Sequence, residues 1–293
     1  MAAAVSKNST IVRSTRARRS RLPLTIRAAR AGFRVIGPYA PKIASGYAER
    51  LFLSPRRHAR PDWETRALEG AERLEIPHEG QLLPAWKWGT GSSTVLLVHG
   101  WEGRGSQLAA FIDPLVARGL SVVAFDAPGH GDAPSGFASV VEHARAVASV
   151  GAYLGRLHAV VGHSVGGAAS LFALRLGLRA DRLALVAPPA SPAEFAASFA
   201  KMLALPANVN RRMITRLERR YGVRMEDLDV RADASRLSVP LLVVHDVGDR
   251  VVSFDDGESI AKAAPQGRLV STHGLGHQRV LRAPEPSAAS ATT

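Results

Sequence analysis

The chain has 293 residues, 46% of them hydrophobic, which is enough for one large α/β domain and an additional segment. It contains no cysteine, so disulfides, thiol nucleophiles and cysteine-based metal sites are excluded, and an intracellular setting is favoured. No apolar run approaches the roughly 18 residues of a membrane span, and no signal-peptide pattern opens the chain. We therefore expect a soluble, cytoplasmic protein.

The formal net charge of +13 is concentrated at one end of the chain. Residues 1–60 hold 14 Lys and Arg against the single acid Glu49, whereas residues 61–293 hold 24 basic and 24 acidic residues. A nucleic-acid partner would bind this basic end in a salt-dependent way, but residues 1–22 lack the aromatic side chains that interleave with bases. We expect no nucleic-acid partner and treat residues 1–60 as a basic N-terminal extension.

Within this extension, residues 1–22 are rich in Arg and Ser and lack acids, which predicts a solvated tail or, alternatively, an arm for targeting or for an anionic surface. Between Leu24 and Leu53, apolar residues recur at near-helical spacing, with a break at Gly37-Pro38. The pattern predicts two short amphipathic helices. They either contact an anionic membrane surface peripherally or pack against the following domain as a brace.

Residues 61–293 alternate between strand and helix candidates, which predicts an α/β fold with a mostly parallel, doubly wound sheet. An antiparallel hairpin is expected first, over Arg73–Pro77 and Leu82–Trp88. The later strands are expected at Thr94–Val98, Leu120–Phe125, Leu157–Gly162, Arg182–Val186, Pro240–Val244 and Arg268–Thr272. The helices between them are expected at Gln107–Arg118, Ser139–Leu154, Val165–Leu176 and Phe254–Ala264.

This alternation is interrupted at about residues 189–238. Helical patterns around Pro192–Leu205 and Asn210–Tyr221 predict a short helical lid over the sheet edge, because a segment of this length inside a compact domain is typical of a lid or an insertion. Its larger apolar side chains belong either to the core or to a substrate wall; they are Phe195, Phe199, Met202, Leu203 and Met213.

A candidate nucleophile lies between the strand Leu157–Gly162 and the helix that follows. Ser164 is flanked by Gly162 and Gly166, and such a strand–turn–helix pattern predicts a nucleophile elbow, since only small residues let strand and helix approach this closely. A serine hydroxyl is a weak nucleophile and needs an imidazole base oriented by a carboxylate.

His277, on a glycine-flanked turn after the last expected strand, is the predicted base, in preference to His273 at the strand end. Asp249, in the loop after Pro240–Val244, is the predicted acid, with Asp246 as the fallback because it could instead cap that turn. The three residues complete a predicted catalytic triad in the chain order Ser, Asp, His.

The oxyanion of acyl transfer requires preorganised donors, and the backbone amides of Val165 and Trp101 are the candidates for this oxyanion hole. His99 is interpreted as a structural residue bonded to backbone, and Asp126 as the acceptor of a well-bonded turn. Neither a G-x-G-x-x-G loop after an early strand nor a P-loop occurs, and no cluster has the spacing of metal ligands. We expect no metal and no organic cofactor.

Five ordered motifs together resemble the α/β-hydrolase superfamily, in its serine esterase/lipase-like branch: His99 to Gly103, Phe125 to Gly131, Gly162 to Gly167, His245 to Asp249, and Gly276-His277. The resemblance runs from about Leu82 to Val280. It implies an eight-stranded, mostly parallel sheet, a lid between the sixth and seventh strands, and acyl-enzyme chemistry at Ser164. Two departures are residues 1–60 and the short tail after His277, where the family usually adds a helix that would hold the histidine loop.

These observations predict a serine hydrolase that cleaves a small-molecule carboxylic ester or thioester through an acyl-enzyme intermediate. An amide or lactone hydrolase stays open because the lid sets leaving-group preference. A non-catalytic ligand-binding or scaffold protein of the same fold is the alternative from another class.

Overall fold

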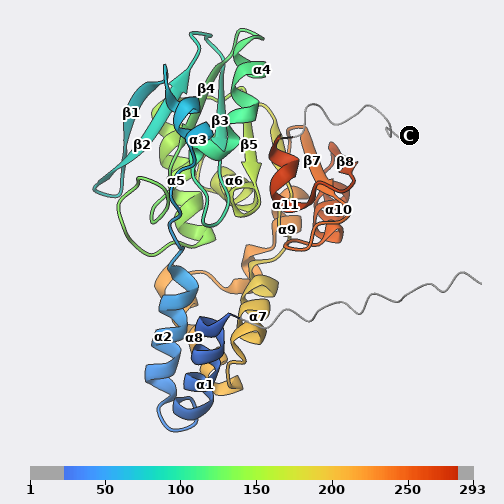
Figure 1. The fold of residues 1–293 in the computed structure, drawn as a ribbon. Helices are drawn as coiled ribbons and strands as arrows, with labels where there is room; N and C mark the ends of the chain where they lie inside the picture. Colours follow the sequence, from blue (N-terminus) through green and yellow to red (C-terminus); the bar gives the residue numbers. More distant parts are fainter. Residues whose placement is uncertain (1–22, 283–293) are drawn as a thin grey trace, which may run out of the picture.

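Eight strands form one sheet in the computed structural model, which describes residues 23–282 (Figure 1). The strand order is β1-β2-β4-β3-β5-β6-β7-β8, and only the β1–β2 and β2–β4 pairs are antiparallel. The strands are β1 (Glu72–His78), β2 (Gln81–Trp88), β3 (Thr94–Val98), β4 (Ser121–Phe125), β5 (Ala159–His163), β6 (Leu183–Val186), β7 (Leu241–Asp246) and β8 (Gly267–Thr272). The predicted fold class and every predicted strand are confirmed, within a few residues at the ends.

The central strands are apolar on both sides because helices cover both faces of the sheet. On one face, α5 (Val140–Leu154), α6 (Val165–Arg175), α9 (Val230–Ala234) and α10 (Phe254–Ala263) pack on the sheet. The other face is covered by α3 (Asp62–Leu68), η1 (Gly105–Phe111), α4 (Ile112–Val116), α11 (Gly276–Arg279) and η3 (Val280–Arg282).

One predicted helix is wrong in form. Instead of a continuous helix over Gln107–Arg118, the chain makes the 3-10 turn η1 and then the short helix α4. Pro114 lacks an amide hydrogen and its ring would collide with a carbonyl one turn earlier in a continuous helix. Starting α4 at Ile112 places this proline in the first turn, where neither cost arises.

The segment between β6 and β7 carries α7 (Pro192–Leu203), α8 (Ala207–Tyr221) and η2 (Met225–Leu228) before α9. The two helices predicted in the extension are present as α1 (Leu24–Ile36) and α2 (Pro41–Leu53). They pack against the inserted helices, α2 on α8 and α1 on α7. Figure 1 shows these four helices, which we call the cap, as a second lobe below the sheet.

A buried carboxylate joins the two parts of the cap. Glu49 of α2 is 3% exposed and accepts hydrogen bonds from Arg216 and Arg220 of α8. The contact joins segments 167 residues apart in sequence. Of the two alternatives for α1 and α2, packing against the rest of the chain is therefore seen, and their partners are the inserted helices α7 and α8. The tail expected at residues 1–22 lies outside the described residues.

Candidate active site

Ser164 lies in the sharp turn between β5 and α6 with φ 52° and ψ −127°, a backbone region that non-glycine residues rarely adopt. The turn forces the strand and the helix together. A methyl group on Gly162 would lie 2.7 Å from Gly167 Cα, and one on Gly166 would overlap the His99 carbonyl oxygen. The glycines beside the serine are therefore required by space, as the sequence pattern predicts.

The structure brings His277 and Asp249 to this serine. His277 Nε2 lies 3.1 Å from Ser164 Oγ, and His277 Nδ1 lies 2.7 Å from Asp249 Oδ2. A carboxylate can only accept, so Nδ1 carries the proton and Nε2 is free to accept from the serine hydroxyl. His277 lies in the short helix α11 rather than on an open turn.

The neighbouring acid and histidine have different environments. Asp246 Oδ2 accepts from Thr272 Oγ1 at 3.0 Å and from the Leu275 amide at 2.9 Å, so it caps the loop that carries His277. Asp249 is itself oriented by the Val251 amide, 2.7 Å from Oδ1. His273, which ranked below His277 as the predicted base, is exposed just after β8.

Two buried histidines beside the site were missed by sequence reasoning. His163 Nε2 donates to the His277 carbonyl oxygen at 3.0 Å, and burial, together with neighbouring His277, lowers the pKa of His163 to about 3. His245 Nε2 lies 3.3 Å from the Val252 carbonyl oxygen and 3.5 Å from Asp249 Oδ2. Both flank predicted residues in sequence, but only the tertiary contact reveals that they hold the base and the acid in place.

The predicted oxyanion donors lie in the chain next to the serine: Val165 follows it directly, and Trp101 follows Gly100. A Cβ on Gly100 would lie 3.0 Å from Ser164 Cβ, so the loop before Trp101 runs directly beside Ser164. In the part of the chain that the structure describes, the amides of Trp101 and Val165 donate to no protein acceptor. Two unengaged backbone donors next to a serine fit the geometry of an oxyanion hole.

Buried polar groups hold the loops around these donors. His99 Nδ1 donates to the Gly100 carbonyl oxygen at 2.8 Å, and Nε2 accepts from the Ala127 amide at 3.0 Å, so the ring is neutral and structural. Asp126 accepts from the amides of Gly105 and Asp132, each at 2.7 Å. Burial raises the pKa of Asp126 to about 6. The structural interpretations of His99 and Asp126 are confirmed.

Residues of the segment that precedes β1 also bind the loop after Trp101. Arg104 Nε lies 2.8 Å from Glu64 Oε2, and both side chains are at least nine-tenths buried. Ser106 Oγ donates to the same carboxylate oxygen at 2.6 Å. Arg104 also donates to the carbonyl oxygen of His58, so the chain that leads from the cap into α3 is joined to the loop beside Trp101.

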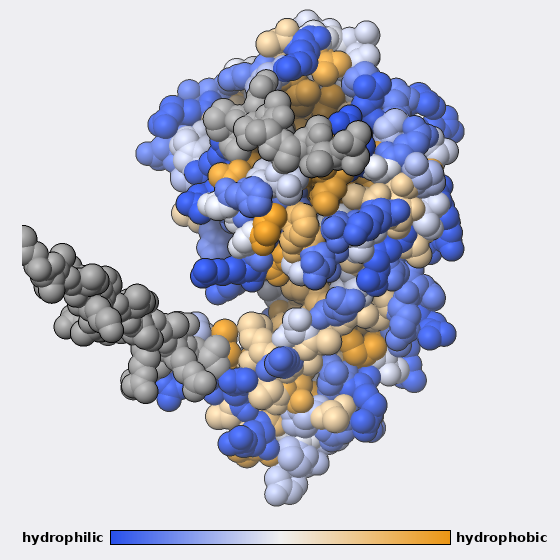
Figure 2. All heavy atoms as spheres, turned by 90° about the vertical axis from the view of Figure 1, so that its right-hand side faces the viewer, coloured by the Kyte–Doolittle hydropathy of each residue, from blue (hydrophilic) through white to orange (hydrophobic). Residues whose placement is uncertain are grey.

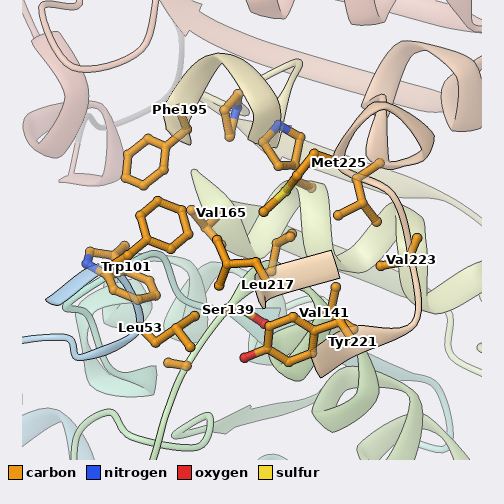
Figure 3. A pocket seen from close by; sticks show the side chains of 17 residues that line it. Leu53, Trp101, Ser139, Val141, Val165, Phe195, Leu217, Tyr221, Val223 and Met225 are labelled. Carbon is orange, nitrogen blue, oxygen red and sulfur yellow. The ribbon is translucent and has the colours of Figure 1, made fainter. Parts of the chain in front are cut away.

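An apolar pocket lies between the sheet domain and the cap (Figure 3). Its empty space is about 690 Å³, part of it open to solvent, and Trp101 and Val165 line it next to the serine. The side chains that Figure 3 shows converging on this space come from α2, α7 and α8 as well, among them Leu53, Phe195, Leu217 and Tyr221. Phe195 is thus a wall residue, whereas Met213 is fully buried in the interior of the cap.

One group of potential metal ligands occurs among residues 23–282. Atoms of His78, Glu79 and Glu142 lie within 4.8 Å of one another at the end of the first hairpin. Arg145 Nη1 lies 3.9 Å from Glu79 and supplies a positive charge already. The group has no contact with Ser164 and has no part in the site.

Comparison with known proteins identifies the family. The model of the Alpha/beta hydrolase family matches residues 95–290, and the chain belongs to that family. No curated protein sequence is significantly similar to it. The predicted resemblance is therefore confirmed at the level of the fold and family.

Solved structures of the same fold cover most of the chain. Est816, described as an enzyme degrading N-acyl homoserine lactones, is 18% identical with a TM-score of 0.55, over 71% of this chain and 95% of its own. The 2-hydroxy-6-oxo-6-phenylhexa-2,4-dienoate hydrolase of Rhodococcus sp. strain RHA1 is 22% identical with a TM-score of 0.54, over 72% and 94%. A thermophilic esterase of Thermogutta terrifontis is 21% identical with a TM-score of 0.53, over 72% and 93%. At these identities the likeness establishes the fold alone.

Proposed function

We propose that this chain is a serine hydrolase that cleaves a carboxylic ester or thioester through an acyl-enzyme intermediate. The observation that carries the proposal is the continuous contact from Ser164 Oγ through both nitrogens of His277 to Asp249, at 3.1 and 2.7 Å. Serine activation requires this combination of nucleophile, base and orienting carboxylate.

In the proposed reaction, Ser164 Oγ attacks the substrate carbonyl while His277 Nε2 takes its proton. The amides of Trp101 and Val165 donate to the oxyanion that forms. His277 then returns the proton to the leaving alcohol or thiol as the bond to the carbonyl carbon breaks, which leaves the acyl group on Ser164. Water, deprotonated by the same histidine, attacks this ester. His277 then returns that proton to Ser164 Oγ as the bond between Oγ and the acyl carbon breaks, which releases the acid and restores the free serine. Asp249 keeps Nδ1 protonated throughout and stabilises the imidazolium.

We infer that the apolar part of the substrate occupies the pocket beside Trp101 and Val165. The pocket walls are almost wholly hydrocarbon, and burying such a wall against an apolar acyl chain is favourable by roughly 25 cal/mol per Å². Among the solved structures of this fold, Est816 is described as degrading a lactone, which supports a lactone as the alternative substrate; an amide stays open because the lid sets leaving-group preference.

We further infer the working parts of the chain from these contacts. Residues 61–293 form the catalytic domain, and the segment at about 189–238 acts as its lid. The basic extension, residues 1–60, adds α1 and α2 to that lid, which is supported by the packing of α2 on α8 and by Leu53 in the pocket wall.

The test is to trap the intermediate on the full chain. A series of p-nitrophenyl esters and matched thioesters of increasing acyl length is incubated with the protein, quenched in acid and analysed by peptide mass. We expect an acyl adduct on Ser164 that is absent in Ser164→Ala, together with turnover that His277→Ala abolishes and the exposed control His273→Ala retains. Turnover that survives Ser164→Ala would contradict the proposal, and a folded protein inert toward esters, thioesters, lactones and amides would favour the scaffold alternative.

A further inference from the structure

Helix α1 has apolar side chains on two opposite faces. One face packs into the apolar interior of the cap through Ile26, Ala29 and Phe33. The other face carries Leu24, Ala28, Ala31 and Val35, which recur at helical spacing and are all exposed. Leu24 is 77% exposed and Val35 64%, so no residue of the described chain covers this second face. A helix that only braced the cap would need a single apolar face.

Further exposed apolar side chains lie at the end of α1, in the turn after it and on α2. Ile36, Tyr39, Ile43 and Tyr47 are each about half exposed or more, with Tyr39 at 89%. Six of the fourteen exposed large apolar side chains in residues 23–282 thus lie within residues 24–47. Figure 1 shows the turn between the two helices at the end of the molecule farthest from the sheet. We call this exposed surface of residues 24–50 the hairpin tip.

Positive charges surround these apolar side chains. Arg27, Arg34, Lys42 and Arg50 are exposed, and they form no ion pair within the described part of the chain. The only acid between residues 24 and 53 is Glu49, which is buried and bonded to Arg216 and Arg220. Hydrophobic and strongly hydrophilic residues are correspondingly interspersed over the lower lobe in Figure 2.

From this combination we propose that the hairpin tip docks the protein on an anionic lipid surface. The interface of such a bilayer offers an apolar phase for Val35, Tyr39 and Ile43 and negative headgroups for the surrounding cations. A nucleic acid would use the cations but has no comparable place for exposed aliphatic side chains. The same surface has no acid to repel phosphate, and no helix within residues 23–282 is long and apolar enough to cross a membrane, so the contact is peripheral.

The test is co-sedimentation of the full chain with vesicles of phosphatidylcholine alone and of phosphatidylcholine mixed with phosphatidylserine. We expect binding to the mixed vesicles that weakens as salt is added. Val35→Ser with Ile43→Ser removes apolar area without changing charge and should weaken binding at least tenfold, by the roughly 0.8 kcal/mol per buried CH₂. Arg34→Gln with Lys42→Gln should weaken it about fivefold for each cation removed.

Matched controls are Leu176→Ser, an apolar residue on the sheet domain that is 54% exposed, and Arg118→Gln, an exposed cation there. Both should bind vesicles as the unmodified chain does. Absence of vesicle binding, or binding that the hairpin variants leave unchanged, would overturn the proposal. So would variants that alter only the oligomeric state, or only the retention of duplex DNA, because the tip would then face a second copy or a nucleic acid.

Discussion

The sheet domain and the cap differ in how they hold polar groups. Around Ser164, buried side chains such as His99, Asp126 and Asp246 are bonded to backbone groups of loops at the strand ends. In the described helices of the cap, Glu49 is the only buried charged side chain, and the other charges lie at the surface. The difference fits the two proposals made above, in which the loops at the strand ends fix the reaction geometry and the cap helices set selectivity and location.

The largest loss of activity is expected from substitutions in the sheet domain. Ser164→Ala should lower kcat/KM on the order of 10⁵-fold or more, because the nucleophile is removed, and His277→Ala should cost about as much. The double variant should be no worse than either single variant, since the two groups act as one unit. Steady-state kinetics on one activated ester checks this, and additive losses would show that the residues act separately.

Asp249→Asn should lower kcat by about 10⁴-fold while the fold is retained, because an amide at this position favours the wrong tautomer of His277. The matched control is Ser259→Ala, whose hydroxyl only bonds the Asp256 carbonyl oxygen. Circular dichroism establishes that both variants are folded, and kcat separates them. A small loss in Asp249→Asn would show that His277 is oriented by another group.

The sequence predicts the residues of the sheet domain better than the contacts of the cap. Ser164, Asp249 and His277 lie in short motifs next to strand ends, and a parallel sheet gathers its strand ends at one edge, so their meeting could be anticipated. The contacts of His163 and His245 depend on side-chain packing that no spacing encodes. The cap could not be assembled from sequence either, because α1 and α2 are helical by pattern but their partners α7 and α8 lie far along the chain.

Two buried carboxylates, Glu64 beside the sheet and Glu49 in the cap, should contribute differently to the free energy of unfolding. Glu64→Gln leaves Arg104 buried without a counter-charge and should cost about 3 kcal/mol of unfolding free energy. Glu49→Gln should cost only about 1 kcal/mol, because the side chains of Arg216 and Arg220 are 49% and 39% exposed and water can solvate them. Urea unfolding measures both values, and equal losses would contradict the expected difference between sheet domain and cap.

Acid should weaken the sheet domain through its buried histidines. Burial, reinforced by His130, lowers the pKa of His143 to about 3, so below about pH 6.5 the unfolded chain takes up a proton that the folded state refuses. Stability attributable to His143 is therefore complete above about pH 6.5 and falls by about 1.4 kcal/mol per pH unit toward pH 3. Asp126, whose pKa is raised, changes the stability with pH in the opposite direction. This contribution is the same in the unmodified chain and in a variant that replaces only His143, so it cancels when the two are compared.

His143→Leu isolates this contribution. The slope of unfolding free energy against pH, measured between pH 4 and 6, should be smaller by about 1.4 kcal/mol per unit than in the unmodified chain. An unchanged slope would mean that His143 is protonated in the folded state.

The smallest effect on activity is expected on the cap side. Phe52→Ala removes a pocket wall that contacts Phe195 and Phe199, with ring centroids 5.8 and 5.1 Å away. KM for long-chain esters should rise roughly tenfold while kcat and short-chain KM change little, since only the binding of distant methylenes is lost. Phe33→Ala, in the cap but outside the pocket, is the control, and a loss of kcat in Phe52→Ala would place that side chain in the reaction itself.

The central claim is that the loops at the sheet edge activate Ser164, and labelling with a fluorophosphonate probe tests it most directly. The full chain, Ser164→Ala and His277→Ala are treated with the probe under one set of conditions, and the modified residue is mapped by peptide mass. The account predicts labelling confined to Ser164 and lost in both variants. A folded chain that is not labelled, or that is labelled equally well without His277, would contradict it.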